Sequence, residues 1–158
     1  MAQVSLDKID LIVIKQLLDD GRASFSSIAK ETGLTDVAIK KRVESLKRRG
    51  IISGISAELN HKVLGFENPI FVQMRVEAGK SRDVIKKLNA LDHVVELYQV
   101  LGEYNLVGKI VVQNLDSAER LIEQLGTLDG IIDIKSLVVL SELKKTKSLP
   151  AQALQKTL

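Results

Sequence analysis

The chain has 158 residues, 45% of them hydrophobic but only 3% aromatic, and its formal net charge is +3. This is enough for one ordinary domain or two small ones, with a core of Ile, Leu and Val. The absence of cysteine excludes disulfides, thiolate metal sites and cysteine nucleophiles. So few rings argue against binding single-stranded nucleic acid by base stacking.

Other classes of protein are disfavoured by what the sequence lacks. No apolar run approaches the ~18–20 residues of a membrane span, and residues 1–10 lack the apolar core of a signal peptide. His61 and His93 are far apart, and we interpret both as surface residues without a ligand role. We therefore expect a cytoplasmic protein with no metal site, no cofactor, no membrane partner and no enzymatic activity.

Positive charge is concentrated in residues 36–49, which carry six Lys or Arg against two acidic residues. This surplus exceeds that of the whole chain, so the remainder is slightly acidic. A basic helix on an otherwise balanced protein is typical of a polyanion-binding site. The alternative is an ordinary solvated helix face.

Apolar periodicity predicts three helices near the N-terminus, over residues 7–20, 26–32 and 36–48. Asp7 and Thr35 are good N-caps for the first and third helices. A turn at Gly33-Leu34 separates the last two, and Ile39, Val43 and Leu46 form the buried stripe of the third. The pattern is that of a helix-turn-helix; a purely structural three-helix bundle is the alternative.

Small residues open the third helix and allow its backbone to approach a major groove, while long basic side chains reach phosphates or guanine edges. The predicted DNA-binding residues are Thr35, Asp36, Ala38, Lys40, Lys41, Arg42, Ser45 and Arg48. Residues 51–58 are then predicted to form a strand, giving a winged module. Asn60 is expected to cap one helical turn before a break at residues 67–69.

The C-terminal part alternates between strand and helix patterns. Strands are predicted over residues 70–77, 94–101, 105–113 and 131–141, and helices over 81–91 and 115–126. The order is βαββαβ, so we expect an α+β fold with a ferredoxin-like sheet covered by helices on one face. The other face, with Phe71 or Met74 and Tyr98, needs a cover, and a second subunit in a homodimer is the simplest one.

The predicted domains are therefore residues 1–58 for DNA binding, a linker at 59–69, a βαββαβ oligomerisation domain at 70–142, and a tail at 143–158. The tail reads as a mobile basic segment with a short terminal helix, and we assign it no function.

This layout resembles the Lrp/AsnC, or feast/famine, family of transcription regulators over residues 6–142. The resemblance rests on LDKID at 6–10, GR at 21–22, SIAKETGLT at 27–35, RVESLKRRGII at 42–52, LG at 64–65 and GEYN at 102–105. It implies double-stranded DNA as a partner, self-association as dimers assembling to octamers, and a C-terminal amino-acid-metabolism regulatory domain that binds an amino acid.

The resemblance also implies that the turn Gly102-Glu103-Tyr104-Asn105 helps form the effector pocket between dimers. A Gly-led turn can expose backbone N–H groups to a carboxylate, although a plain hairpin turn is the alternative. The family commonly has Asp where Asn105 stands, and Asn cannot neutralise an α-ammonium. We therefore expect Glu103 or another carboxylate to do so.

The predicted effector-binding set surrounds that turn. Glu119 and Glu123 lie four residues apart on one helix face and are included, with solvated surface as their alternative. The full set is Gln99, Val100, Leu101, Gly102, Glu103, Tyr104, Asn105, Glu119, Glu123, Ile134, Lys135 and Ser136. Carboxylates lining a pocket favour an effector with a polar amide or cationic side chain: glutamine, asparagine, lysine or arginine.

The first hypothesis is thus a sequence-specific, amino-acid-responsive DNA-binding regulator. An effector-independent DNA-architectural protein is the second. A tetrapyrrole decarboxylase of the same fold is the third, and it is disfavoured because such an enzyme needs a cluster of His and Arg. The C-terminal part offers only Arg75, Arg82 and one His.

Overall fold

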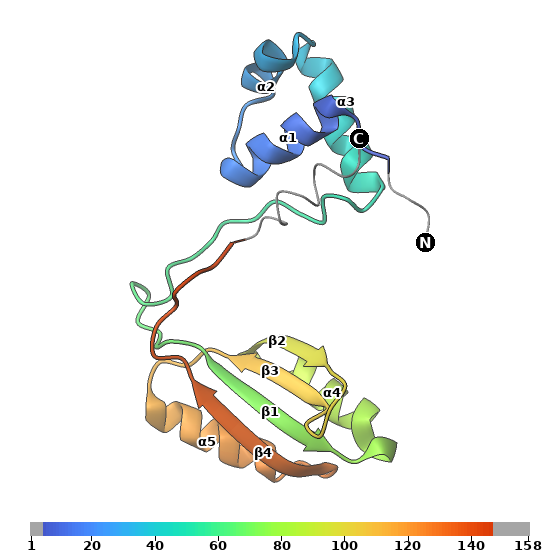
Figure 1. The fold of residues 1–158 in the computed structure, drawn as a ribbon. Helices are drawn as coiled ribbons and strands as arrows, with labels where there is room; N and C mark the ends of the chain where they lie inside the picture. The colour runs from blue at the N-terminus through green and yellow to red at the C-terminus, as the bar shows by residue number, and fades with distance from the viewer. Residues whose placement is uncertain (1–4, 147–158) are drawn as a thin grey trace. The chain divides into compact units, whose positions relative to one another are not determined.

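The computed structural model describes residues 5–146, which separate into two compact units (Figure 1). The chain passes from the first unit to the second between Glu58 and Leu59, and the second unit ends at Lys144. Lys145 belongs again to the first unit. Most of the predicted tail, residues 147–158, lies outside the described residues.

The first unit consists of three helices, α1 (Lys8–Asp19), α2 (Phe25–Thr32) and α3 (Asp36–Arg48). Each begins at a residue whose side-chain oxygen accepts a backbone N–H of the first turn, which is why the sequence starts a helix there. These N-caps are Asp7, Ser24 and Thr35. The three predicted helices are confirmed.

The core of the first unit is aliphatic. Ile39, Val43 and Leu46 of α3 are buried, as their spacing predicts, and they pack against Val13 of α1 and Ile28 of α2. Between α2 and α3, Gly33 takes a left-handed conformation with φ of 72° and so permits the tight turn. The apolar faces of all three helices are therefore buried against one another.

The strand predicted over residues 51–58 is wrong. After Gly50 the backbone bends, because the N–H groups of Ile51 and Ile52 both donate to the carbonyl of Leu46 (2.9 and 3.3 Å). Residues 53–58 then run without regular secondary structure and join no sheet in the described part of the chain. An apolar run reads locally as a strand, but a strand also needs a partner for its ladder.

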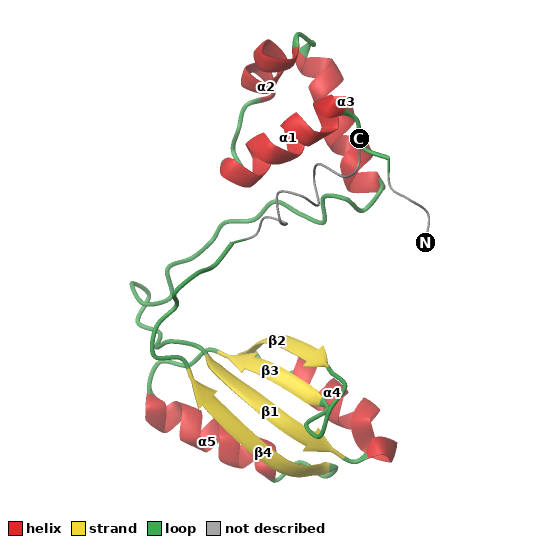
Figure 2. Ribbon diagram, viewed as in Figure 1, coloured by secondary structure: helices red, strands yellow, loops and turns green. Residues whose placement is uncertain are grey.

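The second unit is built on a four-stranded antiparallel sheet with the order β2-β3-β1-β4. Its strands are β1 (Ile70–Val76), β2 (Val94–Gln99), β3 (Leu106–Ile110) and β4 (Ile131–Val138). The helices α4 (Ser81–Asn89) and α5 (Leu115–Gly126) lie on one face of the sheet (Figure 2), and a 3₁₀ turn, Ala78–Lys80, precedes α4. The predicted α+β fold with βαββαβ order is confirmed.

Alternation along β1 decides which side chains enter the core. Ile70, Val72, Met74 and Val76 are buried against α4 and α5. Met74 therefore lies on the helix-covered face and does not belong to the open face, where it was one of the expected side chains. Its neighbours in the strand alternate to the other side.

The other side of the sheet has no cover in the described part of the chain. Phe71 pairs in register with Leu137, which is 52% exposed, and Tyr98 is 51% exposed. We call this surface the open sheet face.

The segments that flank the sheet are also ordered. Asn60 accepts the N–H of Val63 in a turn over residues 61–65, and Asn68 Nδ2 donates to the carbonyl of Leu140. No helix of the described chain is long and apolar enough to cross a membrane.

Candidate DNA and effector sites

The exposed face of α3 carries cations that make no ion pair with any described residue. Lys40, Lys41, Lys47 and Arg48 are all exposed. At the start of the helix, Thr35 and Asp36 are exposed and Ala38 is half-buried, while Ser45 is half-buried further along. Seven of the eight predicted DNA-binding residues thus leave at least part of their surface to solvent, and none of them forms an ion pair with a described residue.

Arg42, the eighth, is held differently. Its Nη1 donates to Asp7 Oδ2 at 2.6 Å and to Asp10 Oδ1 at 2.8 Å, both at the start of α1. Asp10 is the buried acidic residue of the unit, with only 10% of its side chain exposed, and Arg49 Nη1 lies 3.8 Å from its other oxygen. Arg42 therefore ties α3 to α1, and this pairing occupies the guanidinium that was expected to contact DNA.

Electrostatics at this junction favour the charged forms. Partial burial of Asp7 opposes ionisation, but hydrogen bonds from the Asp10 N–H and from Arg42 outweigh it, so the pKa of Asp7 lies below its ordinary value. The same hydrogen bonds to Asp7 and Asp10 raise the pKa of Arg42 above its already high value. The pair stays ionised at neutral pH.

In the second unit, the turn between β2 and β3 projects from one end of the sheet. Val100 donates its N–H to the carbonyl of Asn105 (3.0 Å), which closes the turn, and Gln99 ends β2. Leu101 at the tip is fully exposed. Gly102 has a φ of 154°, which L side chains rarely adopt, so this position needs glycine.

Asn105 is a structural clamp. Its Oδ1 accepts the N–H of Val76 at 2.8 Å, and its Nδ2 donates to the carbonyl of Val76 at 2.9 Å. One amide thus satisfies both backbone groups at the end of β1, where a carboxylate could only accept. Asn at this position is explained by the sheet, and its side chain is already engaged there.

Charged side chains of both signs gather beside the turn. The Tyr104 hydroxyl donates to Asp133 Oδ2 at 2.5 Å, and Lys135 Nζ lies 4.4 Å from the centre of the Tyr104 ring. Arg75 pairs in register with Asp133 across β1 and β4, and its Nη1 lies 4.0 Å from Glu103 Oε1. We call Arg75, Glu103, Tyr104, Asp133 and Lys135 the turn cluster.

Contacts within the turn cluster shift the pKa values of two of its members, Asp133 and Lys135. The hydrogen bond from Tyr104 lowers the pKa of Asp133, helped by the charges of Arg75 and Lys135. Interaction with the Tyr104 side chain raises the pKa of Lys135, with smaller contributions from Glu103 and Asp133. Both charges are therefore stabilised at neutral pH.

In addition, the Arg75 Nε is buried and has no hydrogen-bond partner among the described residues.

Not all predicted effector residues join this cluster. Ile134 and Ser136 pair in register with Met74 and Val72, so they belong to the helix-covered side of β4, and only Lys135 of that triplet faces the turn.

Glu119 and Glu123 are exposed on α5, in the layer on the other side of the sheet, and no described contact joins them to the turn. Within one chain the structure therefore does not bring these two carboxylates to the predicted pocket.

Two members of the cluster were missed by the sequence-based prediction of the effector site. Arg75 and Asp133 face the same side as Lys135 because strand residues alternate. The alternation of β1 places Arg75 on the open sheet face, and Asp133 is two residues before Lys135. The alternation of the two strands could therefore have predicted both residues.

The described residues hold no group of three His, Asp or Glu side chains that could bind a metal.

Comparisons with known proteins match two family models to the chain. Residues 6–47 match the model of the AsnC-type helix-turn-helix domain, and residues 70–149 match the model of the Lrp/AsnC ligand binding domain. The HTH-type transcriptional regulator FL11 of Pyrococcus abyssi is 33% identical over 94% of this chain and 98% of its own length. Regulatory protein AsnC of Escherichia coli is 29% identical over 89% of this chain and 93% of its own.

Solved structures give the same result. The structure of E. coli AsnC superimposes with a TM-score of 0.86 at 28% identity, covering 93% of this chain and all of that one. A transcriptional regulator of Neisseria meningitidis, solved with L-Met, shares the fold with a TM-score of 0.88 at 21% identity, over 95% and 99% of the two chains. The chain belongs to the Lrp/AsnC family of DNA-binding transcriptional regulators, which are not enzymes and which combine a helix-turn-helix with a ligand-binding domain.

Proposed function

We propose that this chain regulates transcription by sequence-specific DNA binding that responds to an amino-acid effector bound at the turn cluster. The observation that carries the proposal is the juxtaposition of both charge signs beside one glycine turn. An amino acid needs a cation or N–H groups for its carboxylate and an anion for its ammonium. Arg75 or Lys135 supplies the first, and Asp133 or Glu103 supplies the second.

The DNA contact is assigned to the exposed face of α3. Lys40, Lys41 and Arg48 contact phosphates, which gives affinity, while Thr35, Asp36, Ala38 and Ser45 approach base edges, which gives specificity. Arg42 holds α3 against the start of α1 through its ion pairs with Asp7 and Asp10.

The assembly is assigned to the open sheet face, covered by a second copy in a homodimer. Half-buried and exposed side chains on this face, among them Phe71, Leu137 and Tyr98, are costly to leave in water. Further association of dimers into an octamer would bring the turn clusters of different dimers together.

The effector class is argued from charge. Carboxylates at the cluster favour a polar amide or cationic side chain, so glutamine, asparagine, lysine and arginine are the first candidates. The L-Met complex of the N. meningitidis regulator supports an amino acid as the ligand class.

The test is a thermal-shift screen with the twenty amino acids on the wild-type chain and on Gly102→Val. A ligand at 100 times its Kd stabilises the folded state by about 2.7 kcal/mol. We expect one or more of the candidates to raise the Tm of the wild type and to leave Gly102→Val unchanged, because a β-branched residue cannot keep φ at 154° without strain.

Gly79→Val is the matched control, since it lies in the same unit, where a Cβ meets open space and φ is ordinary. It should retain the shift, and all three chains should bind DNA without effector. A full shift in folded Gly102→Val would move the pocket elsewhere. No shift with any amino acid in the wild type would favour an effector-independent architectural protein.

A further inference from the structure

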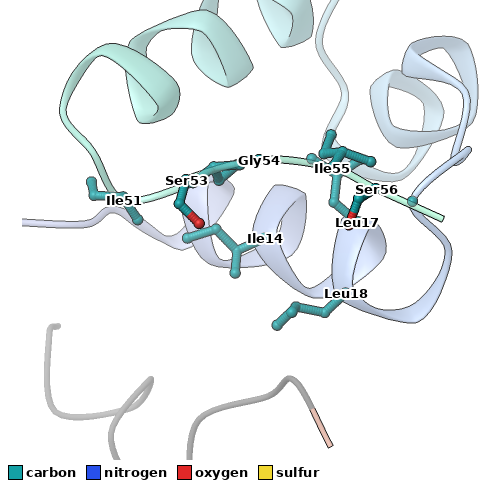
Figure 3. Close-up of a pocket in the computed structure, with 10 residues that line it drawn as sticks. Ile14, Leu17, Leu18, Ile51, Ser53, Gly54, Ile55 and Ser56 are labelled. Atoms are coloured by element: carbon teal, nitrogen blue, oxygen red, sulfur yellow. The ribbon is translucent and has the colours of Figure 1, made fainter. Parts of the chain in front are cut away.

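A charged hollow opens beside α4 in the second unit. Its volume is about 500 Å³, and it is lined by Lys80, Asp83, Lys86, Lys87, Ala90 and Asp129. The hollow between α1 and residues 51–56 of the first unit has a similar volume, about 540 Å³, but none of the described residues that line it is charged (Figure 3). The hollow beside α4 is therefore the one that suits an ionic partner.

α4 carries a surplus of positive charge on its exposed side. Arg82, Lys86 and Lys87 are exposed and form no ion pair with a described residue, and Asp83 is the one acidic residue of the helix. The helix dipole favours cations in the last turn, but Arg82 lies in the first turn, where the dipole opposes it. Arg82 and Lys86 also repel each other, because residues four apart are neighbours on a helix. The stability of α4 alone does not explain this arrangement.

α5 carries the opposite surplus. Its acidic residues Asp116, Glu119 and Glu123 are spaced i, i+3 and i+7 along one stripe, are exposed, and form no ion pair with a described residue. Arg120 is the one basic residue of the helix, and its Nη2 donates to Ser117 Oγ. Glu119 and Glu123 repel each other, and Glu123 lies in the last turn, where the dipole opposes an anion. These charges too lack an explanation within their own helix.

The two charged helices lie in one layer, at opposite edges of the sheet. α4 packs against β2 and α5 packs against β4, and these are the two edge strands (Figure 1). A second copy, turned by half a rotation about an axis that runs along the layer between the helices, would bring its α5 against this α4 and its α4 against this α5. Three exposed cations would then meet three exposed anions twice, so the layer is complementary to itself.

We propose that this helix layer docks a second copy of the chain, with α4 of each copy against α5 of the other and the carboxylates of α5 entering the hollow beside α4. The layer is on the other side of the sheet from the open sheet face, so both surfaces can be occupied at once (Figure 2). Exposed ion pairs are individually weak, so one such contact does not hold two monomers together. The inference therefore rests on the proposed homodimer, which presents two helix layers and lets dimers associate multivalently.

Charge reversal of each helix, alone and together, tests the contact. Arg82→Glu/Lys86→Glu makes both helices acidic, and Glu119→Lys/Glu123→Lys makes both basic. In light scattering at low ionic strength, the wild type should exceed twice 17.4 kDa, while each reversal variant should stop at that mass. All four changes in one chain exchange the two signs and should restore the larger assembly, which misfolded variants would not do. An equimolar mixture of the two reversal variants should restore it as well.

The matched control is Lys62→Glu/Lys144→Glu, which makes the same charge change at two exposed residues of this unit outside the helices. It should keep the mass of the wild type. Salt at about 1 M, where the Debye length is about 3 Å, should return the wild type to the dimer, because exposed charges are then screened.

Several results would overturn the proposal. One is a wild type no heavier than a dimer at low ionic strength; a monomer would mean that the proposed homodimer fails too. Others are reversal variants that keep the wild-type mass, or a combined variant that does not recover it. If Arg82→Glu/Lys86→Glu kept its mass but bound DNA more weakly, α4 would be a DNA contact instead of a docking surface.

Discussion

Arg42 and its neighbour Lys41 separate two roles of α3, and replacing each by Ala tests the separation. In Arg42→Ala, Asp10 keeps a charge that is 90% buried and loses the guanidinium 2.8 Å away. A hydrogen bond to a charged group is worth about 1.5–3 kcal/mol. The bond to Asp7, which is half-exposed, adds roughly 0.5 kcal/mol.

Arg49 remains 3.8 Å from Asp10 and offsets part of the loss, so we expect a net cost of about 2–3 kcal/mol. For a unit of fewer than 100 residues this lowers Tm by roughly 10–20 °C. Lys41 is exposed and has no ion pair in the described chain, so Lys41→Ala should change stability by less than about 0.5 kcal/mol.

The assay is thermal unfolding followed by circular dichroism at 222 nm, paired with DNA binding well below the lower Tm. Lys41→Ala should weaken binding to all DNA sequences through a lost phosphate contact. Arg42→Ala should bind nearly as well as the wild type while it remains folded. If Arg42→Ala is as stable as Lys41→Ala and binds DNA more weakly, Arg42 contacts DNA and the ion pairs do not hold α3.

Three further predictions follow from single contacts. Because the folded pKa of Asp7 lies below 3.8, its stabilisation is complete at neutral pH and is lost as pH falls below about 4; acid titration should show this loss reduced in Arg42→Ala. Asn105→Asp should destabilise the second unit by about 1–2 kcal/mol, because a carboxylate cannot donate a hydrogen bond to the carbonyl of Val76, and it should not tighten effector binding. Asn114→Asp is the control: the Asn114 side chain only accepts a hydrogen bond as an N-cap, so this variant should keep the stability of the wild type. Phe71→Glu should convert the proposed homodimer to a 17.4 kDa monomer in light scattering, and a dimer retained in this variant would exclude the open sheet face as the interface.

Local patterns predicted the elements well because their causes are local. The stripe of Ile39, Val43 and Leu46 follows from helical periodicity, and the cap at Thr35 depends on a backbone N–H three residues away. The alternation of β1 likewise defines which of its side chains enter the core.

Features that depend on distant partners could not be predicted in the same way. Arg42 meets carboxylates 32 and 35 residues away, and Asn105 clamps a backbone 29 residues away. Neither pairing can be predicted from the residues next to Arg42 or Asn105 in the sequence. Residues 51–58 show the opposite case: their sequence has the pattern of a strand, but they form none, because no partner strand supplies the backbone hydrogen bonds of a ladder.

These distant pairings also change how the charge of α3 should be counted. Two of the six cations in residues 36–49, Arg42 and Arg49, lie against Asp10 and stabilise the fold rather than project positive charge. Four cations then remain for phosphates on each chain. Since each neutralised phosphate contributes about 0.9 to the salt slope, one recognition helix can account for at most about 3.6, and a dimer for about 7. In the proposed complex, sequence specificity then has to come from the small residues at the start of α3, because phosphate contacts carry no sequence information.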